Sequence, residues 1–275
     1  MNKYDSKIVG LDVGLLIGKF FMDTEDLHYG YWPNDKKATA KNFAEAQYRH
    51  SKLIIDHIPN GVKRILDVGS GSGNLAKRLI NLGYHVDCVI PSKFLAERVQ
   101  EKLDKKSKIH VCKFEDVELT QTYDLILFSE SFQYIRLEES LQKVQKLLTA
   151  NRYLLICDVF HKNVEGKSPM RGGHRLDYFE KAIGESKFNL VKDLDITKET
   201  APTYDFLNQL LTDVAEPIAD MSGEYLNYKY PKLAKLVKWK FSKKLDRINQ
   251  VWFSGELTGE NFIKYKSYKL LIYKT

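Results

Sequence analysis

The sequence is poor in cysteine. Only three of its 275 residues are cysteines, Cys88, Cys112 and Cys157, and they lie far apart. They are too few for a disulfide framework, and none stands in a Cys-x-x-Cys pair or a Cys/His run of the kind that holds zinc. We therefore predict a cytoplasmic protein, in a reducing compartment, with no metal site.

Long apolar runs are also lacking. The apolar stretch at residues 8–21 is interrupted by Asp12 and Lys19, has no small-residue cleavage site after it, and is too short to span a bilayer. This pattern predicts neither a signal peptide nor a membrane helix. With 43% hydrophobic and 29% charged residues, the chain can bury one substantial core, which excludes disorder, collagen and coiled coil.

Outside one segment the chain has almost no excess of positive charge. The formal net charge is +7, and residues 232–247 hold seven lysines and arginines against Asp246 alone. The apolar residues of this segment share one helical face: Leu233, Leu236, Val237, Phe241 and Leu245. We favour a lid helix with its apolar side against the core, and keep contact with an anionic membrane surface or with nucleic acid as alternatives.

Short Val/Ile/Leu-rich runs alternate with helical patterns through the first two thirds of the chain. The expected strands are residues 64–68, 85–90, 108–114, 123–128 and 153–160, with a last one at 268–273. Helices are expected at residues 39–57, 74–82, 92–103 and 137–148. This alternation predicts an α/β fold with a Rossmann-like, doubly wound, mostly parallel sheet.

The chain reads as one domain in four parts. Residues 1–58 form an N-terminal helical cover, and residues 59–200 form a cofactor-binding core. Residues 201–260 have helical periodicity and form a helical lid, and residues 261–275 hold the final strand. No linker separates two independent domains.

A glycine-rich turn follows the first strand directly and opens the next helix. Its sequence is Asp67-Val68-Gly69-Ser70-Gly71-Ser72-Gly73. Small residues allow a tight strand-to-helix turn and the close approach of a ligand to the main chain. A carboxylate before the glycines would repel the pyrophosphate of a dinucleotide, whereas it suits a ligand that carries an amino group there. A dinucleotide-dependent oxidoreductase is therefore the least favoured function.

Residues 65–73 closely resemble motif I of the class I S-adenosylmethionine-dependent methyltransferases. The resemblance implies S-adenosylmethionine as the cofactor, with Asp67 and the turn around Gly69, Ser70, Gly71 and Gly73 holding its amino-acid end. It also implies that Glu115 or Asp116 contacts the adenine. Residues 123–131 resemble motif IV, whose strand ends at Ser129 and Glu130 beside the sulfonium.

Two further segments extend the resemblance. Residues 27–32, Leu-His-Tyr-Gly-Tyr-Trp, are similar to a segment of small-molecule members of the tocopherol, glycine-betaine and cyclopropane-synthase types, as are residues 195–197 and 201–203. Where relatives carry a Pro-Gly-Gly turn before the fifth strand, this chain has Asn151, which is expected to take the left-handed conformation.

One departure concerns the ribose of the cofactor. Relatives end the second strand with an acid that binds the ribose hydroxyls, but an ungapped alignment places Ile90 there, followed by Pro91. Asp87 lies three residues earlier and faces the other side of the strand. Either the alignment register slips, or another group, such as Ser92, holds the ribose.

The resemblance also suggests where chemistry occurs. Methyl transfer from a sulfonium depends mainly on alignment and on exclusion of water, and a base is needed only where an acidic proton must leave. Glu130 is the first candidate for that base, followed by Tyr29 and His28, although a histidine among aromatic residues is often only a core residue.

The predicted function is methyl transfer from S-adenosylmethionine to nitrogen, oxygen or carbon of a small metabolite or natural product. One alternative is a lipid-modifying enzyme of the cyclopropane-synthase type at the membrane surface. The other is a cofactor-binding protein without methyl transfer. A small-molecule substrate and no nucleic-acid partner are expected, and the oligomeric state stays open.

Overall fold

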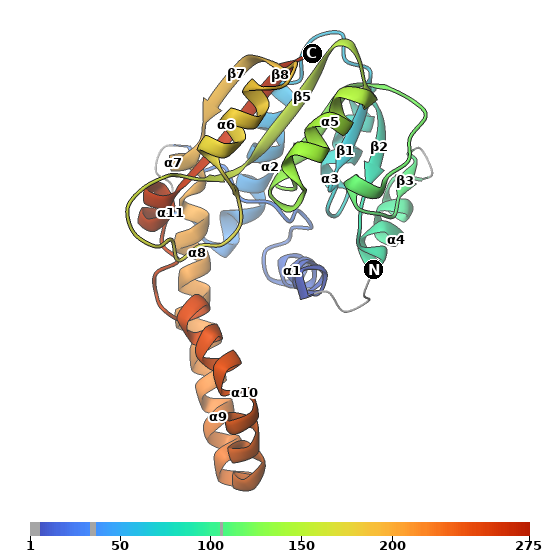
Figure 1. Cartoon of the computed structure of the whole chain (residues 1–275). Coiled ribbons are helices and arrows are strands. Elements are labelled where there is room, and N and C mark those ends of the chain that lie inside the picture. Colours follow the sequence, from blue (N-terminus) through green and yellow to red (C-terminus); the bar gives the residue numbers. More distant parts are fainter. Residues whose placement is uncertain (1–5, 34–36, 105–106) are drawn as a thin grey trace.

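The computed structural model describes residues 6–33, 37–104 and 107–275, with residues 6–9 described by their backbone alone. It shows a central sheet between two helical layers, and a long helical pair that projects from one end (Figure 1). The strands are β1 (Arg64–Val68), β2 (His85–Val89), β3 (Ile109–His110), β4 (Tyr123–Ser129), β5 (Leu148–His161), β6 (His174–Arg175), β7 (Asn189–Asp195) and β8 (Lys266–Lys274).

The helices lie between and around these strands. They are α1 (Ser6–Phe21), α2 (Ala40–Asp56), α3 (Asn74–Asn81), α4 (Lys93–Lys102), α5 (Leu137–Leu147), α6 (Leu176–Gly184), α7 (Thr197–Thr200), α8 (Pro202–Leu210), α9 (Glu216–Lys229), α10 (Pro231–Trp252) and α11 (Gly259–Tyr265). Short turns are η1 (Phe114–Asp116), η2 (Phe132–Tyr134) and the π-helical η3 (Leu211–Ala215).

The strand order creates a crevice beside β1. The sheet runs β3-β2-β1-β4-β5-β8-β7, with β6 paired to β5 outside this path. The chain moves outward from β1 to β3 and then crosses back to β4, so the direction of winding reverses between β1 and β4. Ligands of open α/β sheets bind at such a reversal, outside the carboxyl ends of the strands. β8 runs antiparallel to its neighbours β5 and β7.

Strand alternation places a large apolar cluster on each face of the sheet. Ile65 and Leu125 belong to the cluster beneath α2, α3 and α4, whereas Leu66 and Ile126 belong to the cluster beneath α5 and α6. These four residues are fully buried. Both faces are covered, as a mostly parallel sheet requires, and the expected fold class is confirmed.

The sequence predicted most strand positions and missed one edge of the sheet. The third strand was expected at residues 108–114 but is only Ile109–His110, since the chain leaves the sheet there and turns into η1. The edge strand β7 was missed because its residues are almost all exposed and show no alternation of burial. The prediction for Asn151 is confirmed: it has φ +59° inside β5, where the register with β4 shifts.

The region 201–260 is helical, as expected, but it does not close over the sheet. α9 and α10 pack on each other, and this hairpin extends away from the body of the molecule (Figure 1). Within α10 only Ala234 is buried. The expectation that the apolar side of this helix packs on the core is therefore wrong, because the helices pair with one another instead. α8 does pack inward, with Thr203 and Tyr204 buried.

Candidate active site

The glycine turn between β1 and α3 has three glycines at positive φ, and they serve different purposes. A Cβ on Gly69 would lie 2.3 Å from Cβ of Ser131, and one on Gly73 would lie 2.9 Å from Cγ2 of Val99. These two positions need glycine for packing. A Cβ on Gly71, at φ +54°, would meet nothing nearer than Leu27, 3.8 Å away. Gly71 is thus the point where a ligand can approach the main chain.

Asp67, the next-to-last residue of β1, has a buried carboxyl group. Asp67 is 1% exposed, and its Oδ2 has no hydrogen-bond partner among the residues that the structure describes. Burial raises its pKa to about 7, although Ser70 opposes this. A buried polar atom without a partner is unusual in a native protein. An ammonium group bound at the turn would satisfy Oδ2 and stabilise the ionised form, so the residues present fit the amino-acid end of S-adenosylmethionine.

At the end of β2 the predicted ribose position is apolar and buried. Ile90 is 1% exposed and belongs to the core cluster that also includes Leu15 of α1. Asp87 faces elsewhere, as expected: it accepts hydrogen bonds from Lys108 N and from the hydroxyl of Tyr123. The half-buried Pro91 follows.

A carboxylate reaches this edge of the sheet from the N-terminal helix. Ser92 caps α4 by accepting from Leu95 N, and its Oγ donates to Oδ1 of Asp12 at 3.2 Å. Asp12 is half-buried on α1, eighty positions earlier in the chain. Sequence reasoning treated Asp12 only as an interruption of an apolar run, because no local pattern connects it with β2.

The two acids expected at the adenine lie in η1 and differ in their surroundings. Oε1 of Glu115 accepts from Arg136 N at 3.0 Å, which ties this carboxylate to the start of α5. Asp116 is exposed. The structure thus leaves the carboxylate of Asp116 more accessible than that of Glu115.

Glu130 follows β4 in a conformation that side chains rarely adopt. Its φ is +53°, and its Oε1 accepts from Tyr29 N at 2.6 Å and from the Tyr268 hydroxyl at 2.7 Å. Within the described part of the chain, no group hydrogen-bonds its Oε2. Burial raises the pKa of Glu130 to about 8. Left-handed backbone at a residue that is not glycine, combined with a perturbed carboxyl group, is typical of functional sites. The buried Oγ of the neighbouring Ser129 has no hydrogen-bond partner in the described ranges.

The hydrogen bonds at Glu130 continue into the protein. The Tyr268 hydroxyl lies 2.8 Å from Nε2 of His50, whose Nδ1 has no partner among the described residues. Burial lowers the pKa of His50 well below its ordinary value, so this imidazole is neutral. Sequence reasoning missed both residues, since Tyr268 lies in the last strand and His50 on a helix far from any motif.

Tyr29 and His28 occupy different surroundings. The main chain of Tyr29 contacts Glu130, and its hydroxyl lies 2.8 Å from that of Tyr204. The His28 ring stacks on His50, and its Nε2 lies 3.0 Å from Oγ of Ser51. Tyr29 therefore contacts Glu130 directly, whereas His28 is linked to Glu130 through His50 and Tyr268.

Residues 22–33, hereafter the strap, cross over the glycine turn. Gln47 donates to the carbonyl oxygens of Asp26 and His28. At the other end, Oγ1 of Thr203 accepts from Gly30 N and from the Trp32 indole. These bonds and the one from Tyr29 N to Glu130 hold the strap near the carboxyl end of β4, with Leu27 3.8 Å from the position that a Cβ on Gly71 would take.

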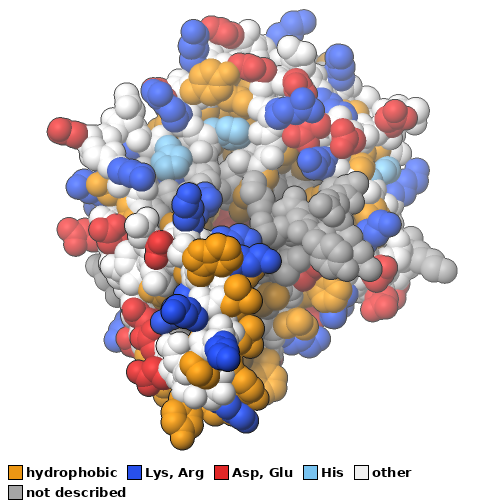
Figure 2. Space-filling model, turned by 60° about the horizontal axis from the view of Figure 1, so that its bottom comes forward, with side chains coloured by type: hydrophobic (Ala, Val, Ile, Leu, Met, Phe, Trp, Pro, Cys, Tyr) orange, Lys and Arg blue, Asp and Glu red, His pale blue; other side chains and the backbone are white. Residues whose placement is uncertain are grey.

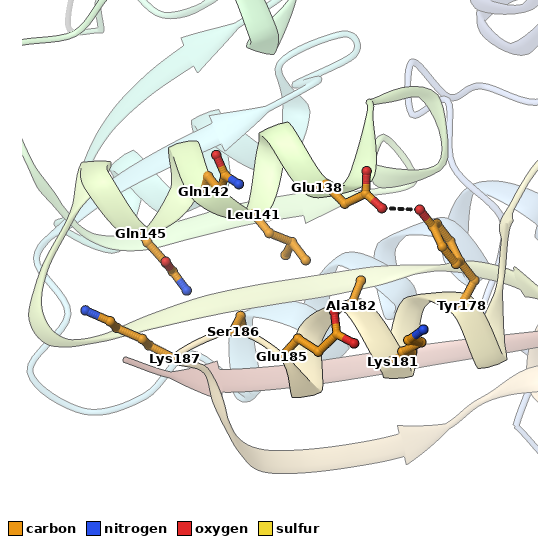
Figure 3. Close-up of a pocket in the computed structure, with 10 residues that line it drawn as sticks. All are labelled: Glu138, Leu141, Gln142, Gln145, Tyr178, Lys181, Ala182, Glu185, Ser186 and Lys187. Carbon is orange, nitrogen blue, oxygen red and sulfur yellow. Dashed lines mark hydrogen bonds between the residues drawn. The ribbon is translucent and has the colours of Figure 1, made fainter.

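A separate groove lies on the outer helical layer. It measures about 450 Å³, lies between α5 and α6, and is lined mainly by polar and charged side chains, with Tyr178 hydrogen-bonded to Glu138 (Figure 3). None of the predicted site residues lines it. In the described ranges no group of His, Cys, Asp and Glu side chains could hold a metal ion. Over the same residues, every helix is too short or too polar to cross a bilayer.

The strand order, the antiparallel β8 and the glycine turn with its preceding acid define a Rossmann-like fold of the methyltransferase type. A family model described as "Methyltransferase domain" matches residues 66–154. An uncharacterized methyltransferase of Alkaliphilus oremlandii (strain OhILAs) is 29% identical over 152 residues, which cover 54% of this chain and 63% of that relative.

Solved structures share the fold over nearly the whole chain. The cyclopropane synthase MmaA2 from Mycobacterium tuberculosis has a TM-score of 0.69 at 14% identity, covering 96% of this chain and 95% of that one. Geranyl diphosphate C-methyltransferase from Streptomyces coelicolor A3(2), in complex with geranyl diphosphate and S-adenosyl-L-homocysteine, has a TM-score of 0.67 at 13% identity. This match covers 100% of this chain and 98% of that one. The [4+2]-cyclase SpnF has a TM-score of 0.67 at 15% identity, covering 98% of this chain and 94% of that one. The chain thus contains a methyltransferase domain over residues 66–154, and nearly its whole length shares the fold of these solved structures.

Proposed function

We propose that this protein transfers a methyl group from S-adenosylmethionine to a small organic acceptor held between the strap and the carboxyl ends of β1 and β4. The observation that carries the proposal is the pair of carboxyl groups at this edge. Among the described residues Asp67 has a buried oxygen without a partner beside the glycine turn, and Glu130 follows the adjacent strand with its Oε1 bound by Tyr29 and Tyr268.

The residues divide the binding of the cofactor among them. Asp67 binds the amino group, and the open turn at Gly71 admits the methionine moiety. Asp12, positioned by Ser92, replaces the missing acid at the end of β2 and accepts from the ribose hydroxyls. Asp116, the more accessible acid of η1, contacts the adenine. When bound, the cofactor supplies the electrophilic methyl group.

Glu130 takes the proton that an acceptor loses. In the ligand-free protein its pKa of about 8 leaves it mostly protonated at neutral pH. A positive charge bound nearby favours its ionised form, because opposite charges within a few ångströms lower a carboxyl pKa. Oε1 is held by Tyr29 and Tyr268, so Oε2 is the oxygen that faces an acceptor N–H or O–H. The closed strap excludes water, which strengthens these electrostatic interactions.

A small acceptor agrees with the fold relative that binds geranyl diphosphate. The likeness to a cyclopropane synthase supports the lipid-modifying alternative, and the likeness to a [4+2]-cyclase supports a site without methyl transfer. The unsatisfied oxygen of Asp67 favours cofactor binding in all three cases. Oε2 of Glu130, to which no described residue donates, favours removal of a proton, which an amine or hydroxyl acceptor requires.

The cofactor site is tested by calorimetry with S-adenosyl-L-homocysteine. Gly71→Val should abolish binding or weaken it more than tenfold, because the side chain fills the approach to the main chain. Gly83→Val is the matched control: Gly83 also has positive φ, and a Cβ there meets nothing within 4 Å. Equal binding by wild-type and a folded Gly71→Val protein would refute the assignment.

Methyl transfer is tested separately by screening metabolite extracts with isotopically labelled S-adenosylmethionine. We expect the wild-type protein to form a product that carries the labelled methyl group. The Glu130→Gln variant should no longer form this product but should still bind S-adenosyl-L-homocysteine. Binding without a labelled product in any extract would favour the cofactor-binding protein that lacks methyl transfer.

A further inference from the structure

The hairpin of α9 and α10 exposes an unusual amount of apolar surface for an element so far from the core. Its exposed large side chains are Ile218, Met221, Tyr225, Leu226, Tyr228, Tyr230, Leu233, Leu236, Val237, Trp239, Phe241, Leu245, Ile248 and Trp252. Trp239 is 77% exposed and Tyr228 is 89% exposed. Contiguous exposed apolar surface of this kind marks an interaction site.

One face of α10 mixes these apolar side chains with lysines. Residues four apart are neighbours on a helix. Leu236 therefore lies between Lys232 and Lys240, and Trp239 lies between Lys235 and Lys243. This face bears apolar groups and positive charge together, whereas Ala234, the one buried residue of α10, lies on another side.

The positive charge of α10 is not neutralised within the hairpin. α10 carries seven basic residues and one acidic residue, and the acids of α9, Glu216, Asp220 and Glu224, form their own row four residues apart. In the part of the chain that the structure describes, no ion pair joins that row to α10. Figure 2 shows hydrophobic and basic side chains gathered on the projecting part, with acidic ones along one flank.

We propose that the α9–α10 hairpin docks on an anionic lipid bilayer, with the Lys/Trp face of α10 against the headgroups. Anionic lipids attract the lysines, and the interface accepts Trp239 and Leu236, which is the behaviour of interfacial helices rich in lysine and aromatic residues. A second copy of the chain would bring the same positive face against this one. Nucleic acid would attract the lysines but would leave the large apolar surface in water. The inference does not depend on which acceptor is methylated.

Vesicle sedimentation tests the proposal on the full chain. Wild-type protein should bind vesicles of phosphatidylserine and phosphatidylcholine at least tenfold more tightly than pure phosphatidylcholine vesicles, and high salt should weaken this binding. The triple variant Lys240→Gln, Lys243→Gln, Lys244→Gln should lose at least tenfold in affinity. Trp239→Ser should also weaken binding, because it removes the side chain that enters the interface.

A matched control separates the hairpin from overall charge. The triple variant Lys146→Gln, Lys181→Gln, Lys187→Gln makes the same charge change on exposed residues of the α5–α6 side and should bind as wild type does. Tryptophan emission should shift to shorter wavelength on adding anionic vesicles, and Trp239→Phe should remove most of that shift. This readout reports insertion independently of sedimentation.

Three results would overturn the proposal. The first is no binding to anionic vesicles at low salt, and the second is an equal loss in both triple variants. The third is a different partner in the absence of vesicle binding: either a salt-sensitive shift of RNA or DNA, or a dimer in sedimentation velocity that Trp239→Ser dissociates.

Discussion

At the scale of single residues, two carboxylates near the carboxyl ends of β2 and β4 are held by partners far away in the chain. Glu130 is held by Tyr29 and Tyr268, and Asp12 is held by Ser92. Ile90 has the opposite surroundings, being buried among apolar residues. A new carboxylate at position 90 would be desolvated in the core, so Ile90→Asp is expected to destabilise the protein rather than to improve the ribose site.

Asp12→Asn should weaken binding of S-adenosyl-L-homocysteine about tenfold, because a charged hydrogen bond to the ribose is worth about 1.5 kcal/mol or more. Isothermal titration calorimetry measures the change. Asp87→Asn is the control, since the carboxylate of Asp87 already binds Lys108 N and Tyr123. Unchanged affinity in the Asp12 variant would mean that another group holds the ribose.

Glu130→Gln should change how stability depends on pH in the ligand-free protein. With a folded-state pKa of about 8 against 4.5 for an ordinary Glu, folded Glu130 keeps a proton that the unfolded chain loses. The stability that this protonated carboxyl group contributes to the folded state is fully present below pH 4.5 and is lost as the pH rises toward 8. Between pH 5 and 7.5 the wild type should therefore lose about 1 kcal/mol per pH unit relative to the variant.

Urea unfolding at several pH values measures that difference. The wild type should likewise lose stability relative to Asp158→Asn as the pH rises, because burial raises the pKa of Asp158 to about 7. Parallel stability curves for wild type and the Glu130 variant would contradict a carboxyl group that stays protonated in the folded protein.

At the scale of elements, the strap depends on one buried hydroxyl. Thr203→Val keeps the shape of the side chain but leaves the donors of Gly30 and Trp32 without a partner. We expect a loss of about 2 kcal/mol in the free energy of unfolding, since a buried unsatisfied donor costs roughly 1–3 kcal/mol. Denaturant titration measures the loss, and cofactor affinity should fall with it because the strap crosses the glycine turn.

Thr212→Val makes the same chemical change one helix later. There the hydroxyl donates its one proton either to the Asn208 carbonyl oxygen or to Oδ1 of Asp213. A small effect is expected at this position. If both substitutions lower the free energy of unfolding equally, Thr203 does not anchor the strap.

At the scale of the whole molecule, the core and the hairpin are nearly independent. Replacing residues 216–252 with a Gly/Ser linker should change Tm by less than about 2 °C, which is below the effect of 1 kcal/mol in a protein of this size. The reason is that Ala234 is the one buried residue in α9 and α10. Calorimetric scanning measures Tm. Cofactor affinity should persist, and its loss would show that the hairpin contributes to the site.

Local patterns determined much of this protein. The central strands follow from apolar runs, and the glycine turn follows from residues that tolerate positive φ. Asn151 takes the left-handed conformation expected of it. Each of these features depends on neighbours in the chain, so the sequence alone was enough to predict them.

Only the tertiary structure decided the remaining features. The contacts Ser92–Asp12, Tyr268–Glu130 and His50–Tyr268 join residues that lie 80, 138 and 218 positions apart. The helical periodicity of α10 was visible in the sequence, but its apolar face packs partly on α9 and otherwise faces solvent. Periodicity specifies that a helix has an apolar face, whereas the surface that covers this face is set by packing between distant elements.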